Sequence, residues 1–227
     1  MKKLLKKIYS YTFSPIKTFK SDLKLIQFYY SKFFVKYIYK IDIEQESRYF
    51  YPNYSDLYNL INLILKYNPK KCIEVGGGYS TFVILKALET NFKKDGVKAS
   101  LISMEQSVEY INIHKNYLKN NLSDITYNFL DLRKTELVTD DFLNTKVSKC
   151  TNLELKKLDF FYEDRTDHPK HKIAGDAIMF EHRSEASFII VIDGMIQTSE
   201  FYKKNLKGRY NIKGGFFNGT SFIPKKN

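Results

Sequence analysis

The first residues along this chain that could bind a ligand or take part in catalysis lie around a glycine-rich turn at residues 76–78. Residues 72–75 before it are mostly apolar and predict a buried parallel strand. Ser80 after it predicts the N-cap of a helix that runs to about Phe92. Glycines let a backbone turn sharply and approach a ligand closely. Strand, glycine turn and helix in this order predict the first βαβ unit of a nucleotide-binding α/β domain.

An acid before the turn separates this motif from other glycine-rich ones. Glu74 lies two residues before Gly76, and Thr81 stands where a dinucleotide fingerprint has its third glycine. A carboxylate facing the ligand from Glu74 would repel a pyrophosphate and attract an ammonium group. The pattern Glu74-x-Gly76-x-Gly78-x-Ser80 resembles motif I of class I S-adenosylmethionine-dependent methyltransferases. The ligand of that family carries a cationic amino acid and a sulfonium but no phosphate.

The resemblance implies S-adenosylmethionine as the cofactor. Residues 99–104 predict a second strand that ends at Glu105, where a carboxylate could accept hydrogen bonds from both hydroxyls of a ribose. Asp131 closes a predicted third strand at 125–130, and the family often has an acid near this point against the adenine amino group. The expected cofactor-binding residues are Glu74, Gly76, Gly77, Gly78, Ser80, Glu105 and Asp131.

The richest cluster of acid–base groups follows a predicted fourth strand at residues 159–163. Asp164 or His168 could remove a proton from a hydroxyl. Asp193 follows a predicted fifth strand at 186–192 and should project at the same edge. We therefore expect Asp164, His168 and Asp193 to be catalytic. Two alternatives stay open: carboxylates here could hold Mg²⁺, as in some O-methyltransferases, or the charges could belong to a solvated loop.

Periodic apolar residues predict the elements that position these groups. Further helices are expected over residues 55–67, 108–118, 173–182 and 198–206. Residues 133–158 read as irregular, with a short helix at 153–158, and residues 209–212 and 220–223 read as two closing antiparallel strands. The order predicts a Rossmann-like class I methyltransferase sheet of about seven strands, mostly parallel, with an antiparallel end hairpin and flanking helices. In a rival interpretation, residues 186–192 form the fourth strand.

The charge distribution divides the chain of 227 residues into an extension at 1–45 and a methyltransferase-like domain at 46–227. Residues 1–40 hold ten lysines and one acid, a local charge of +9 out of +12. Apolar residues recur at helical spacing from Phe19 to Tyr37, but lysines interrupt them, so we reject a transmembrane span. This basic aromatic helix could dock on an anionic membrane surface, or pack on the domain or on another subunit.

These features predict a methyltransferase acting on a small-molecule, glycan or lipid-linked acceptor, with O-methylation by in-line transfer. The alternatives are an RNA methyltransferase with a basic N-terminal arm and a non-catalytic assembly factor with this fold. Only five of the 37 basic residues are arginine, which argues against base readout of nucleic acid. Two cysteines provide no disulfide framework and fit a cytoplasmic protein, peripheral at the inner membrane face if the extension docks there.

Overall fold

The structure is a computed structural model. It describes residues 54–153, 157–164, 173–184, 187–206, 208–214 and 219–225. Residues Asn59–Asn227 form one compact unit, and only Tyr54–Tyr58 are described from the unit that precedes it. The predicted extension at 1–45 and the candidate base His168 lie outside the described residues. Within the described part, no helix is both long and apolar enough to cross a membrane.

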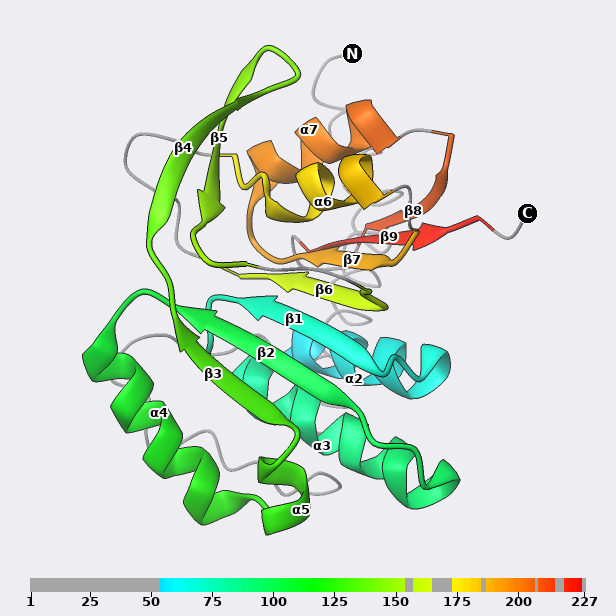
Figure 1. Ribbon diagram of the computed structural model, residues 1–227. Helices are drawn as coiled ribbons and strands as arrows, with labels where there is room; N and C mark the ends of the chain where they lie inside the picture. The colour runs from blue at the N-terminus through cyan, green and yellow to red at the C-terminus, as the bar shows by residue number, and fades with distance from the viewer. Residues whose placement is uncertain are drawn as a thin grey trace, which may run out of the picture. The chain divides into compact units, whose positions relative to one another are not determined.

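A seven-stranded sheet of order β3-β2-β1-β6-β7-β9-β8 forms the centre of this unit (Figure 1). Its parallel strands are β1 (Lys71–Val75), β2 (Ser100–Glu105), β3 (Leu130–Lys134), β6 (Phe160–Glu163) and β7 (Ile189–Ile192). The closing antiparallel strands are β8 (Tyr210–Gly214) and β9 (Thr220–Pro224). The strand order reverses between β1 and β6, and ligands of open α/β sheets bind at such a switch point. This topology confirms the predicted fold and excludes the rival interpretation, because residues 189–192 form the fifth parallel strand.

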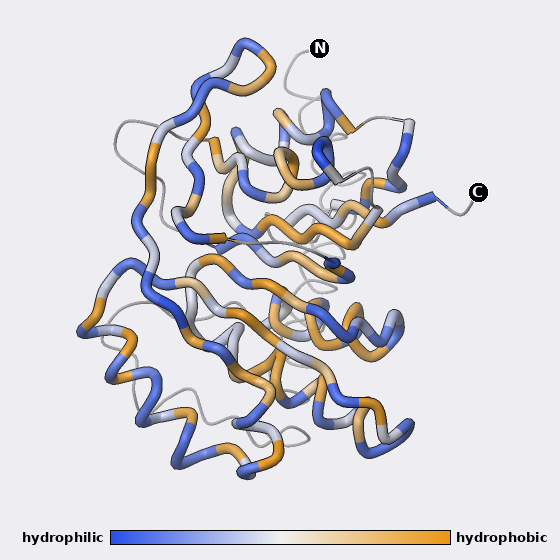
Figure 2. Tube along the Cα trace, viewed as in Figure 1, coloured by the Kyte–Doolittle hydropathy of each residue, from blue (hydrophilic) through white to orange (hydrophobic). Residues whose placement is uncertain are grey.

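The helices cover the sheet in two groups, with α2 to α5 beside β1–β3 and α6 and α7 beside β6–β9 (Figure 1). They are α2 (Tyr54–Tyr67), α3 (Tyr79–Asp95), α4 (Val108–Asn121), α5 (Asp124–Tyr127), α6 (Asp176–Ser184) and α7 (Ile196–Leu206). Apolar residues run along the central strands and alternate with polar ones on the helices (Figure 2). Every residue of β6 and β7 is buried, as expected for parallel strands covered on both faces.

The third strand does not lie where the sequence predicts it. The predicted strand at 125–130 is replaced by α5, and β3 begins only at Leu130. The reason is local capping, because the Ser123 side chain accepts a hydrogen bond from the Thr126 amide and starts a helical turn.

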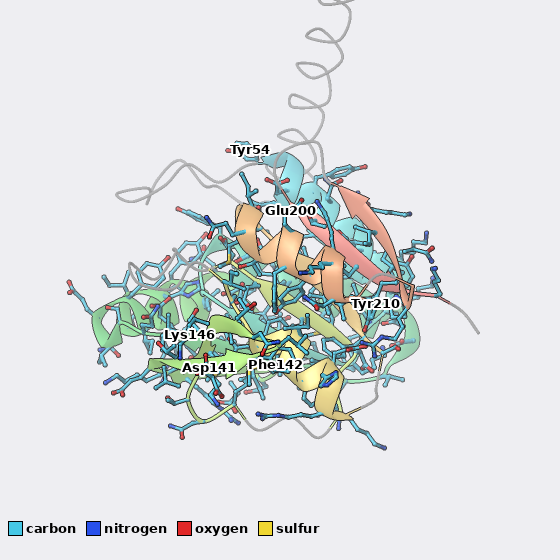
Figure 3. All side chains as sticks on the ribbon, turned by 90° about the horizontal axis from the view of Figure 1, so that it is seen from above. Tyr54, Asp141, Phe142, Lys146, Glu200 and Tyr210 are labelled. Atoms are coloured by element: carbon cyan, nitrogen blue, oxygen red, sulfur yellow. The ribbon has the colours of Figure 1, made fainter. Side chains whose placement is uncertain are left out.

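The stretch expected to be irregular forms a separate two-stranded hairpin. Strands β4 (Leu137–Phe142) and β5 (Thr145–Cys150) are joined by Leu143 and Asn144, which have φ of +48° and +58°. Positive φ at both turn residues is typical of a type I′ turn. The sequence Asn-Gly would predict such a turn, but Leu-Asn does not. Figure 3 shows Asp141, Phe142 and Lys146 on this hairpin. Of the short helix predicted at 153–158, the described residues are not helical.

Candidate active site

The glycine turn joins β1 to α3; the backbone at Gly76 favours glycine, and the backbone at Gly77 leaves little room for a side chain. Gly76 has φ of +89°, which disfavours residues with a side chain, and its amide donates to the Met104 carbonyl at 3.0 Å. A Cβ at Gly77 would lie 3.0 Å from Ser103 Oγ, so the backbone here packs directly on β2. The turn is therefore pinned against the end of the neighbouring strand.

Helix α3 begins one residue before Ser80, which is a correction to the predicted cap. The N-cap is Gly78, whose amide donates to Thr81 Oγ1 and whose carbonyl accepts from the Thr81 amide, both at 3.1 Å. Gly78 has φ of −179°, an extended conformation open to any residue. A Cβ built there would meet only Tyr110 Oη, at 3.6 Å. A larger side chain at Gly78 would therefore occupy space beside the turn rather than strain the backbone.

Glu74 lies beneath the turn and is fully buried. Its carboxylate accepts hydrogen bonds from Ser80 Oγ, Thr81 Oγ1 and Ser103 Oγ. Burial raises the pKa of Glu74 to about 7 although these three hydroxyls lower it, and the charge of Asp164 raises it further. The prediction that this carboxylate faces the ligand is wrong, because it points inward and binds β1, α3 and β2 together. The Ser80 hydroxyl is likewise buried and engaged with Glu74.

Glu105 stands at the carboxyl end of β2, where the sequence predicts it. Its Oε1 accepts the amides of Gln106 at 2.7 Å and Ser107 at 3.0 Å, which fixes the carboxylate at the start of α4. No hydrogen bond to its other oxygen is found within the described residues, and the side chain is partly exposed. Glu105 therefore keeps an oxygen that could accept a hydrogen bond from a ribose hydroxyl.

Asp131 does not lie at this edge. It is the second residue of β3, pairs in register with Ile102 in the middle of β2, and forms an ion pair with Arg133 at 2.5 Å. Its side chain is about half exposed. The prediction that Asp131 closes the third strand is wrong because the strand starts later, and we leave Asp131 out of the cofactor site.

The two expected catalytic acids come together beside the turn. Glu163 pairs with Val75 on one side and Ile192 on the other, so Asp164 and Asp193 follow adjacent strand ends. The Asp164 amide donates to the Val75 carbonyl and the Asp193 amide donates to the Glu163 carbonyl, both at 2.9 Å. Asp164 therefore stands between the glycine turn and Asp193.

A tyrosine that no sequence motif indicates orients one of these acids. Tyr162 Oη donates to Asp193 Oδ2 at 2.9 Å. Burial raises the pKa of Asp193, and the hydrogen bond from Tyr162 lowers it. Asp164 keeps an exposed surface, but the surrounding protein desolvates its carboxyl and raises its pKa to about 7, with a further increase from the charge of Asp193. A carboxyl group with a pKa near 7 suits proton transfer near neutral pH.

His114 is a second group beside the turn that no sequence motif indicates. It lies on α4, 7% exposed, and its Nδ1 would be 3.5 Å from a Cβ built at Gly77. Burial lowers the pKa of His114 to about 4. The imidazole is therefore neutral at physiological pH and packs against the glycine turn at Gly77.

Metal binding gains no support here. Among the described residues, no three His, Cys, Asp or Glu side chains come together to hold an ion. A cavity of about 600 Å³ lies elsewhere, between the β4–β5 hairpin and α6, lined by residues such as Lys149, Met179 and Arg183. None of its lining residues belongs to the turn or the acid pair, so we place the candidate site by the strand ends instead.

No protein-family model and no curated protein matches this sequence. Solved structures do match the fold. The S-adenosylhomocysteine-bound methyltransferase PaMTH1 of Podospora anserina has a TM-score of 0.54 and 14% identity, covering 89% of this chain and 87% of that chain. A Staphylococcus aureus protein with a proposed assignment as a caffeoyl-CoA O-methyltransferase has a TM-score of 0.50 and 15% identity, covering 92% and 99%. The chain thus has the fold of class I S-adenosylmethionine-dependent methyltransferases.

Glu74 makes a testable contribution to the pH dependence of stability. Its pKa rises from the ordinary 4.5 to about 7 in the folded protein, so the folded state binds this proton more tightly than the unfolded state. The stabilisation is complete below about pH 4.5 and is lost as the pH rises to about 7, a change of about 3 kcal/mol. Glu74→Gln should remove this part of the slope in denaturant unfolding measured at about pH 5 and about pH 8.

Glu109→Gln, at an exposed position on α4, is the matched control and should keep the wild-type slope. Equal slopes in the wild type and Glu74→Gln would contradict a buried carboxyl with a raised pKa.

Proposed function

We propose that this protein is an S-adenosylmethionine-dependent methyltransferase acting on a small-molecule acceptor, free or carried by a glycan or lipid, with O-methylation as the reaction. One observation carries the proposal. Glu105 is the last residue of β2, and the glycine turn at 76–78, Asp164 and Asp193 directly follow the adjacent strands β1, β6 and β7 at the same edge. Groups suited to a cofactor and groups suited to an acceptor thus share one edge of the sheet.

The residues at this edge fit the cofactor that the fold implies. The glycine turn presents bare backbone where the methionine part would lie, and the free oxygen of Glu105 would accept a ribose hydroxyl. When bound, S-adenosylmethionine supplies a methyl group on a sulfonium, which is activated for displacement. The chain's own contribution is to hold that ligand beside Asp164. The turn at 76–78 contains no basic residue, which a phosphate-containing ligand would favour.

The acid pair supports a hydroxyl acceptor. Asp164 is next to the turn, and Asp193 is held by Tyr162 at a second point of the same edge. A carboxylate with a raised pKa can accept the proton that a hydroxyl loses as its oxygen is methylated. Alignment of the acceptor oxygen with the methyl group would provide much of the rate enhancement.

The same pair disfavours an RNA substrate, because two carboxylates at the acceptor edge would repel a phosphate backbone. We keep as part of the proposal that residues 1–45, with their local charge of +9, bring the enzyme to an anionic membrane surface on the cytoplasmic side.

Calorimetry with S-adenosylmethionine, S-adenosylhomocysteine and NAD tests the cofactor. The first two should bind and NAD should not. Gly78→Val should abolish binding, because the branched side chain would fill space beside the turn. Gly214→Val is the control, since a Cβ at Gly214 in β8 meets nothing within 4 Å. Binding of NAD alone would overturn the assignment.

Glu105→Ala tests the ribose contact. The variant should lose about 1.5–3 kcal/mol of binding free energy for S-adenosylhomocysteine, the range for hydrogen bonds to charged groups. Glu109→Ala, at an exposed position in the first turn of α4, should bind as the wild type does. If the two variants bind equally well while both remain folded, Glu105 does not hold the cofactor.

Asp164→Asn and Asp193→Asn test the acceptor site. Both should bind S-adenosylhomocysteine normally but lose turnover, measured as release of S-adenosylhomocysteine with a library of hydroxylated metabolites and glycan precursors. Wild-type turnover should increase as the pH rises through about 7, because the base must be deprotonated. Full activity of both variants would place the acceptor elsewhere.

A further inference from the structure

The amino edge of the sheet, opposite the candidate site, carries lysines that the proposed function does not use. Helices between parallel strands run antiparallel to them, so the helix C-termini meet at this edge. Lysines occupy the last turns of four of the described helices: Lys66 in α2, Lys93 and Lys94 in α3, Lys119 in α4, and Lys203 and Lys204 in α7. Favourable interaction with helix carbonyls accounts for lysines at these positions.

Other lysines at this edge have no such explanation, because they precede strands. Lys71 opens β1, Lys98 precedes β2, and Lys157 precedes β6. These three strands are neighbours in the order β2-β1-β6. We define the lysine face as the exposed side chains that gather around these three strand starts. They are Lys66, Lys71, Lys94, Lys98 and Lys157.

Hydrogen bonds join the segments that carry the lysine face. The Ser100 amide donates to the Lys70 carbonyl at 2.8 Å, and the Asp159 amide donates to the Lys71 carbonyl at 2.9 Å. Lys70 Nζ lies 2.6 Å from Asp95 Oδ2, which ties the end of α3 to the start of β1. These contacts join the starts of β1, β2 and β6 to the end of α3, so the lysines on these segments lie together at one edge of the sheet.

The acids on this surface are already engaged. Asp95 pairs with Lys70, and Asp159 Oδ2 accepts the backbone amides of Lys70 and Lys71, each at 2.9 Å. Glu89 pairs with Lys86 and Lys93. None of the five lysines forms an ion pair within the described part of the chain. The amides leave the charge of Asp159 in place, so five lysines and this one carboxylate give the lysine face a local charge of about +4 toward an anionic partner.

Two exposed apolar residues lie among these charges. Val97, beside Lys98, is 52% exposed, and Tyr67, beside Lys66, is 36% exposed, with the Lys66 ammonium 5.2 Å from its ring centre. Lysine stems with a tyrosine and a small apolar side chain suit the headgroup region of a bilayer. The absence of arginine from the five favours a lipid surface over a nucleic acid, whose phosphates and bases are bound preferentially by the guanidinium fork.

We propose that the lysine face docks on the surface of an anionic phospholipid bilayer. The candidate site then lies at the opposite end of the strands, which are five or six residues long, about 16–20 Å from the docked edge. The site opens away from the lipid, so the acceptor is either soluble or the distal end of a long lipid-linked headgroup. This docking does not depend on the methyltransferase proposal.

The test uses the full chain and vesicles of phosphatidylcholine with phosphatidylserine in equal amounts, with vesicles of phosphatidylcholine alone as reference. The wild type should sediment with the anionic vesicles at low salt only. Lys71→Glu/Lys94→Glu/Lys98→Glu should weaken this binding at least about tenfold. The control Lys115→Glu/Lys146→Glu/Lys213→Glu changes three exposed lysines elsewhere by the same total charge and should bind as the wild type does. Thermal unfolding by circular dichroism checks that both variants fold.

Three results would overturn the proposal. The wild type could fail to bind anionic vesicles. Both triple variants could bind them equally, which would assign the binding to residues outside the lysine face. The Lys71→Glu/Lys94→Glu/Lys98→Glu variant could keep vesicle binding and lose binding to single-stranded RNA, which would make a nucleic acid the partner.

Discussion

The buried carboxylate of Glu74 is the constraint on which the candidate site depends. Its hydrogen bonds from Thr81 and Ser103 connect the first strand to the helix after the turn and to the second strand. An acid buried in this way stabilises the site only while each oxygen has a partner. The turn therefore cannot shift without breaking a network whose members lie on three elements. A backbone held so firmly can present its glycines to a ligand with little loss of conformational entropy on binding.

The parallel direction of the strands determines at which edge of the sheet the acidic and basic residues lie. Because β2, β1, β6 and β7 point the same way, whatever follows each strand meets at one edge and whatever precedes it meets at the other. Acids such as Glu105, Asp164 and Asp193 occupy the first edge, and lysines such as Lys71 and Lys98 occupy the second. The domain is therefore electrically asymmetric along its strands. A molecule of this kind orients in the field of a charged surface before it makes any contact.

The sequence predicts those parts of the structure that depend on neighbouring residues. Apolar runs predict the strands, and the residues that end these runs predict the site. These residues are the glycine turn, Glu105 and the acids after the fourth and fifth strands. The direction of Glu74 could not be predicted, because a strand buried on both faces has no alternation to show which side chains point inward. The late start of β3 was missed because the Ser123 cap outweighs an apolar run, and the hairpin because Leu143 adopts a conformation that its type rarely takes. The contact between Tyr162 and Asp193 joins residues 31 positions apart and needs the sheet register.

The position of β6 has a consequence for how the chain folds. Strands β1, β2 and β3 pair in sequence order, so the half that carries the glycine turn requires only short loops to close. The strand that brings Asp164 must instead pair with β1, and the hydrogen bond from the Lys71 amide to Asp159 closes a loop of 88 residues. Contacts of such high sequence separation form late, since the entropy of loop closure is lost before the contact is gained. We therefore expect the cofactor half of the site to form first and the acceptor half to be added when the second half of the sheet pairs with β1.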